Sequence, residues 1–250
     1  MTDNNLFLVK IGERAHLEEL VQGVLYCSPS EKYIKQELEL HDKGQGDLLE
    51  GKMRIKTNGG YMEDHVTHER IPIPPNAVFT ISIENVNNMP IFCMTRGTEK
   101  DCSNYISDKE YKIQFSEAFK EEVTNSFKKA DSALIICEPE NFMQSLKSSI
   151  RHEVISDNIR YFDYDILDIN MMYFLLGVDT FEKNQPYSMK YSNRHRHLLC
   201  KDISFSEQRE YRIILLDDEI TEPQKYNFNF NSQYKIVDLH ELFSGVKIKL

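Results

Sequence analysis

The sequence predicts a single globular domain of the α+β class over residues 1–250. Hydrophobic residues make up 40% of the chain and charged residues 28%, a balance typical of folded proteins with a substantial core. Short strand-like segments are mixed irregularly with amphipathic segments, whereas a parallel α/β sheet would show a regular strand–helix period. The sequence also lacks a Walker loop, a GxGxxG turn and a GxSxG elbow. These absences disfavour kinase-like, Rossmann and α/β-hydrolase folds.

The N-terminal segments predict two strands, each followed by a helix. Leu6–Ile11 and the segment 24–27 are short and apolar, as buried strands are. A helix is expected over Arg14–Gln22, where the leucines recur on one helical face. Gly23 suits the left-handed position that follows a helix end, and Ser30 can cap a second helix over residues 31–40.

The rest of the chain predicts further short strands and helices. The segment 68–76 contains three prolines, so it cannot be a central strand. Ser116 is expected to cap a helix, and Ala133–Cys137 has the composition of a buried strand. The segment Arg209–Leu216 is rich in Tyr, Ile and Leu, and it gives the clearest strand prediction in the C-terminal half.

Charge and cysteine usage exclude several classes of protein. The net charge of −10 disfavours a general nucleic-acid coat protein, because an acidic surface repels a phosphate backbone. The five cysteines form no CxxC pair and no HExxH pattern occurs, so we expect neither a metal site nor a disulfide framework. No apolar stretch approaches about 20 residues and the first residues lack a signal-peptide core, which predicts a cytoplasmic protein without a membrane segment.

One short basic run lies in this acidic background. The segment 190–201 is centred on the sequence RHRH. A solvated, charged loop is the first interpretation. The alternative is that its arginines bind the diphosphate of a dinucleotide, since the guanidinium fork matches phosphate geometry.

The segment that begins the C-terminal strand contains the strongest candidate for chemistry. Gln208 and Glu210 are separated by one residue, so in an extended chain both side chains project to the same side. A carboxylate there can bind a ribose hydroxyl and stabilise positive charge at a glycosidic carbon, while the amide orients a nucleophile. The alternative is an exposed edge strand on which Glu210 forms a structural ion pair with Arg212.

This segment resembles the Q/E-x-E signature of ADP-ribosyltransferases, whose fold consists of short strands and helices around a split sheet. The resemblance implies NAD as the substrate, Glu210 as the catalytic glutamate and Gln208 as the residue that positions a protein or nucleic-acid acceptor. Tyr211 would line the same cleft. Lys10 and Arg14 are the candidates for holding NAD from an early strand, and Glu50 is a candidate second carboxylate in the turn GDLLEG.

A looser resemblance covers most of the chain. The order of segments is similar to that of a large uncharacterised bacterial family that ends in a Glu-x-Glu-Trp/Tyr-Arg strand. The matching pieces are Leu6–Ile11, the turn GDLLEG, the segment 92–95 and the segment 208–212, with Gln208 in place of the first Glu and no Trp. This resemblance implies a bacterial toxin or an anti-phage defence effector. The alternative function is a non-enzymatic sensor module that binds a nucleotide or a protein.

Overall fold

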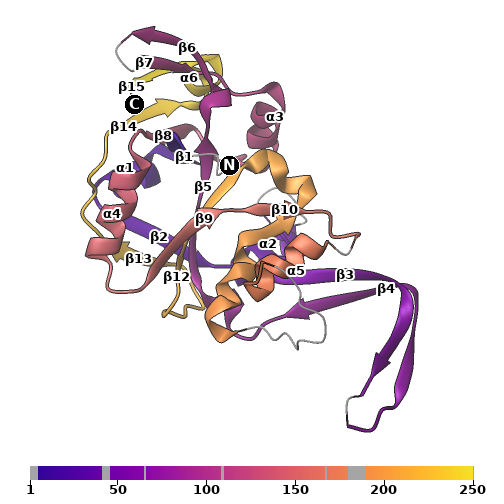
Figure 1. Cartoon of the computed structure of the whole chain (residues 1–250). Helices are drawn as coiled ribbons and strands as arrows, with labels where there is room; N and C mark the ends of the chain where they lie inside the picture. Colours follow the sequence, from indigo (N-terminus) through magenta and orange to yellow (C-terminus); the bar gives the residue numbers. More distant parts are fainter. Residues whose placement is uncertain are drawn as a thin grey trace. The chain divides into compact units, whose positions relative to one another are not determined.

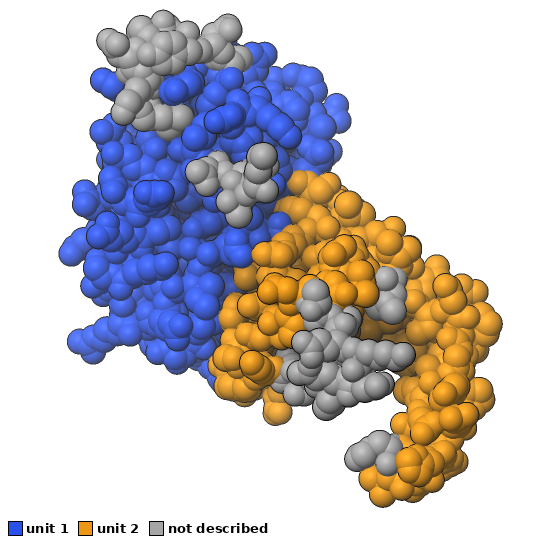
Figure 2. Space-filling model, in the orientation of Figure 1, with its two compact units in different colours: residues 1–48, 88–159, 207–250 blue, residues 49–87, 160–206 orange. Residues whose placement is uncertain are grey.

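The computed structural model describes residues 5–40, 46–64, 66–107, 110–166, 168–179 and 190–249. Helices and mostly antiparallel strands are mixed along the chain, which confirms the α+β class (Figure 1). The contacts divide the chain into two compact units, each built from separated segments (Figure 2). Unit 1 comprises residues 1–48, 88–159 and 207–250, and unit 2 comprises residues 49–87 and 160–206. The prediction of one domain over the whole chain stays a prediction.

Unit 1 is built on a sheet of eight strands in the described part of the chain. These strands are β1 (Phe7–Gly12), β2 (Val24–Pro29), β5 (Pro90–Gly97), β8 (Ser132–Ile136), β9 (Val154–Asn158), β12 (Glu210–Leu215), β13 (Gln224–Asn227) and β14 (Tyr234–Asp238). Their order is β13-β2-β5-β1-β8-β14, and β12 pairs with both β5 and β9. The segment with the clearest strand prediction, β12, is therefore an inner strand and not an edge.

The sheet is split where β1 and β2 meet β5. β12 pairs with residues 91–95 of β5, β1 pairs with residues 95–97 and β2 pairs with residues 90–91. A strand has two edges, and some of the β5 residues that pair with β12 also pair with β1 or with β2. β1 and β2 must therefore share the edge opposite β12. Figure 1 shows β1 and β2 at different ends of β5. On that edge, residues 92–94 of β5 lie between the two partner strands.

Two hydrophobic cores cover the two faces of this sheet. The first core, packed by α1 (Arg14–Val21) and α4 (Pro139–Ser149), includes Leu8, Tyr211 and Ile213 of the strands. The second core, packed by α3 (Glu117–Ser126) and α6 (Leu239–Ser244), includes Val9 and other alternate strand residues. Successive residues of a strand point to opposite faces. The strands β1 and β8 therefore contribute to both cores.

The helix ends of unit 1 follow the predicted local chemistry. Ser116 caps α3, because its Oγ accepts a hydrogen bond from the backbone N–H of Phe119 at 3.2 Å. Gly23 follows α1 with a φ of +91°, the left-handed value that glycine tolerates. The remaining elements of the unit are α2 (Glu31–Leu40), the 3-10 helix η2 (Glu99–Asp101) and a small sheet of β6 (Cys102–Ser107), β7 (Glu110–Ile113) and β15 (Val246–Lys249).

Unit 2 contains a long hairpin and a small parallel pair of strands. The hairpin joins β3 (Lys52–Glu63) to β4 (Arg70–Ser82), where the sequence predicts only separate short strands. The three prolines lie in β4, which has no second partner strand among the described residues, so the segment is not a central strand. The other elements are η1 (Val86–Asn88), β10 (Arg160–Phe162), α5 (Ile169–Leu176), η3 (Tyr191–Leu199), β11 (Cys200–Asp202) and η4 (Ile203–Gln208), with η1 and η4 crossing the unit boundary.

The prediction of a solvated loop for the basic run is wrong. Most of this run forms the 3-10 helix η3, and His197 is only 1% exposed. Arg196 donates from Nη1 to the carbonyl oxygen of Phe174 at 2.8 Å. The apolar residues Leu198 and Leu199 follow directly and are buried, so they draw the end of the run into the interior.

A first prediction concerns the contact between β5 and β1 at Gly97. A Cβ atom at Gly97 would overlap the ring of Phe7, which is fully buried. We expect Gly97→Ala to lower the free energy of unfolding by about 1–3 kcal/mol, because the ring has no space to move. Urea denaturation followed by circular dichroism measures this change. Gly12→Ala is the control, since a Cβ there meets only Leu17 Cδ2 at 3.7 Å. Equal stability of the two variants would contradict the close packing.

A second prediction concerns the buried His197. Neither ring nitrogen has a hydrogen-bond partner among the described residues, and burial lowers the pKa of the imidazole to about 4. An unfolded chain keeps a histidine pKa near 6.5. Between these values the unfolded state binds a proton that the folded state does not, so stability falls as the pH drops from about 6.5 towards 4.

The variant His197→Leu should remove this term. Its free energy of unfolding, compared with that of the unmodified protein at pH 7 and pH 4.5, should lose about 2–3 kcal/mol less on acidification. The same substitution at the exposed His240 is the control and should leave the pH dependence nearly unchanged. An unaltered pH dependence in His197→Leu would show that this imidazole titrates normally.

Candidate functional site at the split of the central sheet

The chain around Gln208 is not extended, and this part of the sequence prediction is wrong. Gln208 ends the 3-10 helix η4, Arg209 has a φ of +46°, and β12 begins only at Glu210. Neighbouring groups of β5 hold this turn: Thr95 Oγ1 donates to the carbonyl oxygen of Gln208 at 3.2 Å, and the N–H of Arg96 donates to the carbonyl oxygen of Arg209 at 2.9 Å. The alternation of a β-strand therefore does not determine where the Gln208 side chain points.

The Gln208 side chain contacts α3 instead. It is 8% exposed, and its Nε2 donates to Glu122 Oε1 at 2.9 Å. Ser126 Oγ donates to the same oxygen at 2.8 Å. Because α3 packs on the second core, Gln208 lies at that face of the sheet.

Glu210 forms a buried ion pair with Arg212. Their side chains are 7% and 1% exposed, and Arg212 places both Nε (2.8 Å) and Nη2 (2.6 Å) on the Oε1 atom of Glu210. The predicted ion pair is thus present, but it lies on an inner strand, so the exposed-edge interpretation is wrong. Glu210 is in register with Thr95, and Thr95 with Val9 of the second core. The carboxylate therefore projects to the second-core face, as Gln208 does.

Lys10 occupies the split between β1 and β2. Its Nζ donates to the carbonyl oxygen of Cys93 at 2.7 Å, and Cys93 belongs to the part of β5 between the two partner strands. The ammonium also lies 4.5 Å from the centroid of the Phe92 ring. Burial lowers the pKa of Lys10, while the negative charge of Glu210 acts in the opposite direction. Lys10 and Glu210 therefore flank β5 within electrostatic range of each other.

The thiol of Cys93 is enclosed by the same charged groups. Burial, followed by the negative charge of Glu210, raises its pKa to about 12. A thiol with that pKa stays protonated at neutral pH, so it is a poor nucleophile. All five cysteines are free thiols. The candidates for binding or catalysis at the split are therefore the charged side chains and not this thiol.

The other predicted site residues lie elsewhere. Tyr211 is in the first core, on the face opposite Glu210, and its hydroxyl donates to Ser156 Oγ at 2.7 Å while burial raises its pKa. Arg14 is exposed at the start of α1, with its guanidinium 4.0 Å from Glu18. Glu50 is 1% exposed and belongs to unit 2. Of the predicted substrate-binding residues, only Lys10 lies within electrostatic range of Glu210.

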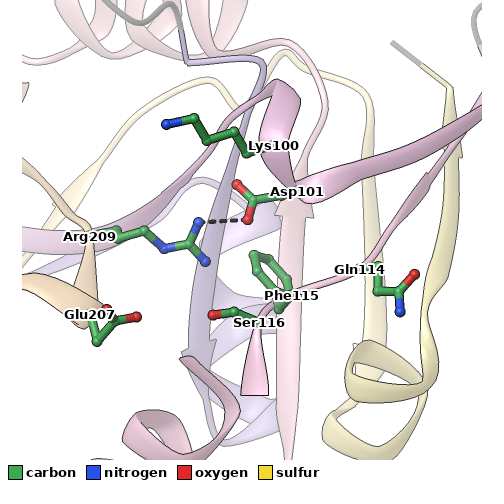
Figure 3. A pocket seen from close by; sticks show the side chains of 7 residues that line it. All are labelled: Lys100, Asp101, Gln114, Phe115, Ser116, Glu207 and Arg209. Atoms are coloured by element: carbon green, nitrogen blue, oxygen red, sulfur yellow. Dashed lines mark hydrogen bonds and ion pairs between the residues drawn. The ribbon is translucent and has the colours of Figure 1, made fainter. Parts of the chain in front are cut away.

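A pocket of about 490 Å³ lies in unit 1 beside the turn at Arg209 (Figure 3). Its lining includes Glu207 and Arg209, which alternate in sequence with Gln208 and Glu210. Glu207 and Arg209 form one side, and Lys100, Asp101 and Ser116 lie around it. Arg209 Nη1 binds Asp101 Oδ1 at 2.6 Å. In the described part of the chain, Lys100 and Glu207 have no ion-pair or hydrogen-bond partner. They can therefore contact a ligand.

Aromatic stacking fixes the position of Arg209. Its guanidinium carbon lies 5.3 Å from the ring centroid of Phe115 and 4.7 Å from that of Phe119. Asp101 is held from its other oxygen, since Oδ2 accepts the N–H of Thr98 at 2.8 Å. The sequence prediction missed Arg209, Asp101 and their pocket. The sequence carries no pattern that joins Arg209 to Asp101, because the two residues are 108 positions apart.

The described ranges contain neither a candidate metal cluster nor a helix that could span a membrane. No three His, Cys, Asp or Glu side chains described by the structure gather closely enough to hold a metal ion. None of the helices in these ranges is long and apolar enough to cross a membrane. In comparisons with known proteins, no family model, no curated protein and no solved structure matches the chain. The resemblance to ADP-ribosyltransferases therefore stays a prediction.

A third prediction tests the ion pair that shapes the pocket. Asp101 is 6% exposed and Arg209 20%, so Arg209→Met leaves a nearly buried carboxylate without its partner. We expect this variant to lower the free energy of unfolding by about 2–4 kcal/mol. Combining it with Asp101→Asn should recover part of that loss, because the unpaired charge is gone. A double-mutant cycle in urea measures the coupling, and additive effects would show that the pair contributes nothing.

Proposed function

We propose that unit 1 is an NAD-cleaving enzyme of the ADP-ribosyltransferase type, with Glu210 as its catalytic residue. One observation carries the proposal: a half-buried cation, Lys10, lies in the split of the central sheet, with the carboxylate of Glu210 within electrostatic range across β5. Charged groups drawn away from solvent on the two strands that flank β5 lose hydration, so their presence is a physical indication of a functional site. A split sheet is also the architecture that the resemblance implies.

The ion pair with Arg212 prepares Glu210 for this role. Nε and Nη2 of Arg212 bind Oε1, so they fix the rotamer of the carboxylate. In the proposed reaction the Glu210 carboxylate accepts a hydrogen bond from a ribose hydroxyl. Its negative charge then stabilises the positive charge that develops at the anomeric carbon when the bond to nicotinamide breaks. Arg212 acts as a positioning residue.

Lys10 supplies the binding charge. An ammonium group has three donors, and Lys10 uses one of them for the carbonyl of Cys93. In the proposed complex the others bind the diphosphate of NAD at the split. A phosphate beside a desolvated lysine favours its charged form, so NAD binding should oppose the lowering of the Lys10 pKa.

The acceptor would lie on the second-core face, to which both Gln208 and Glu210 belong. Gln208 is held by Glu122, which fits a role in positioning an incoming nucleophile. The acceptor is a protein or a nucleic acid, as the resemblance implies. An activity of this kind fits a bacterial toxin or anti-phage defence effector.

A second candidate function, a non-enzymatic sensor module, is favoured by the pocket beside Arg209. Glu210 is only 6% exposed, whereas Lys100 and Glu207 line an accessible cavity and have no described partner. In this alternative the Glu210–Arg212 pair is structural, and a small charged ligand binds in the pocket.

A fourth prediction separates the two functions. Purified protein is incubated with NAD, with and without a cell lysate as acceptor, and released nicotinamide is measured. We expect release that Glu210→Gln reduces at least about 100-fold, since one developing-charge contact contributes that much to a rate. Lys10→Gln should mainly raise the KM for NAD, because it removes ground-state binding.

The controls allow for loss of folding. Lys147→Gln changes an exposed residue of α4 and should leave the rate unchanged. Circular dichroism and urea denaturation are measured for each variant, since Glu210→Gln leaves Arg212 buried without its partner. Absence of release by the folded, unmodified protein in both conditions would overturn the NAD proposal and favour the sensor module.

A further inference from the structure

Arg209 has a conformation and contacts that stability alone does not explain. Its backbone has a φ of +46°, a strained value for a residue other than glycine. Its Nη1 binds Asp101, but its Nε and Nη2 atoms are buried and have no hydrogen-bond partner in the described part of the chain. Its side chain also lines the pocket of unit 1. Strain and unsatisfied donors both destabilise a fold, so at a pocket they indicate a binding site.

Two oppositely charged side chains of the pocket are available to a ligand. Lys100 and Glu207 are exposed, and neither has an ion-pair or hydrogen-bond partner in the ranges that the structure describes. Figure 3 shows them on opposite sides of the ion pair between Arg209 and Asp101. They do not pair with each other, so each can contact a charged group of a bound molecule.

The charges that line the pocket cancel. Arg209 and Asp101 neutralise each other at 2.6 Å, and Lys100 and Glu207 contribute one charge of each sign. A ligand of a single charge would be attracted by one of these two side chains and repelled by the other. A ligand that carries both charges can satisfy both. The pocket is therefore complementary to a zwitterion.

The size of the pocket restricts this ligand to a small molecule. A volume of about 490 Å³ lies within the range of roughly 300–1,000 Å³ that is usual for ligand pockets. The lining also includes the ring of Phe115, which can contact a short hydrocarbon chain. A polymer with many charges of one sign, such as a nucleic acid, does not match a lining of mixed charge.

We propose that this pocket binds a small zwitterion of the amino-acid class, with its carboxylate on Lys100 and its ammonium group on Glu207. The inference names the ligand of the sensor module, so it rests on that second candidate function and not on NAD cleavage. It involves no covalent step. The carboxylate lies beside Arg209 in this complex, so the bound ligand also contacts the strained turn.

A fifth prediction uses amino acids of increasing length as probes. Glycine, β-alanine, γ-aminobutyrate and ε-aminohexanoate are titrated separately into the purified protein without NAD, and binding is measured by isothermal titration calorimetry. We expect one length to bind most tightly, because its charges match the separation of Lys100 and Glu207. Butyrate and butylamine carry one charge each and should bind at least about tenfold more weakly, because each lacks one charged contact.

Charge reversal tests the two contacts. Lys100→Glu and Glu207→Lys should each weaken binding of the best probe about tenfold or more, because one end of the zwitterion then meets a like charge. Neither side chain has a described partner, so both variants should fold, which circular dichroism checks. The double variant restores both charges in reversed order and should recover binding, since the zwitterion can bind in the opposite direction. Lys147→Glu, an exposed change in α4, is the matched control and should bind like the unmodified protein.

Three results would overturn the inference. Absence of binding for every probe would show that the pocket takes no zwitterion of this class. Butyrate that binds as tightly as the best zwitterion would show a site for anions, which contradicts the inference but leaves the sensor function in place. A folded double variant that binds as weakly as the single variants would also contradict it. Nicotinamide release is measured separately, so failure of the NAD proposal does not alter any of these outcomes.

Discussion

The strand β5 and its divided edge determine how unit 1 is built. Three strands hydrogen-bond to β5, and because β12 occupies one edge over residues 91–95, β1 and β2 must share the other. Backbone carbonyls between two such partners need another donor, since an unpaired polar group in the interior is destabilising. Lys10 meets this need at Cys93. A long, flexible side chain thus replaces a strand, and it brings a positive charge to a place that an ordinary sheet would fill with backbone.

The charge of Lys10 also acts on the carboxylate of Glu210 across β5. Burial of an ionised group is unfavourable unless a partner compensates it, and Glu210 obtains its main partner, Arg212, from its own strand. An apolar pair of the same volume would satisfy β12 equally well in structural terms. The fold instead keeps charged residues on β1 and β12, and the group between them, the thiol of Cys93, is held neutral by burial. Under the proposed function, these charges bind a negatively charged dinucleotide at the split and act on it.

The sequence predicted those features that depend on a few neighbouring residues. Ser116 as a helix cap, Gly23 after α1 and the strand after Arg209 are all present, because capping, positive φ and apolar composition act locally. The split could not be predicted, since it depends on which strands share an edge of β5. The extended conformation predicted at Gln208 was wrong because of a single residue. Arg209 has a left-handed φ, which interrupts the extended chain that the i, i+2 argument assumed. The hairpin of β3 and β4 was missed because its register shift and prolines divide it into segments that look like separate short strands.

The turn at Arg209 connects the two candidate functions physically. Its backbone carries Gln208 and Glu210 to the second-core face, while its own side chain forms the wall of the pocket with Asp101. A non-glycine residue at a φ of +46° is strained, and such strain persists only where the surroundings hold it. Here the stacking on Phe115 and Phe119 and the hydrogen bonds from Thr95 and Arg96 do so. A ligand that competes for Arg209 would therefore act on the same turn that positions Gln208, and the two proposed functions would be coupled through this one residue.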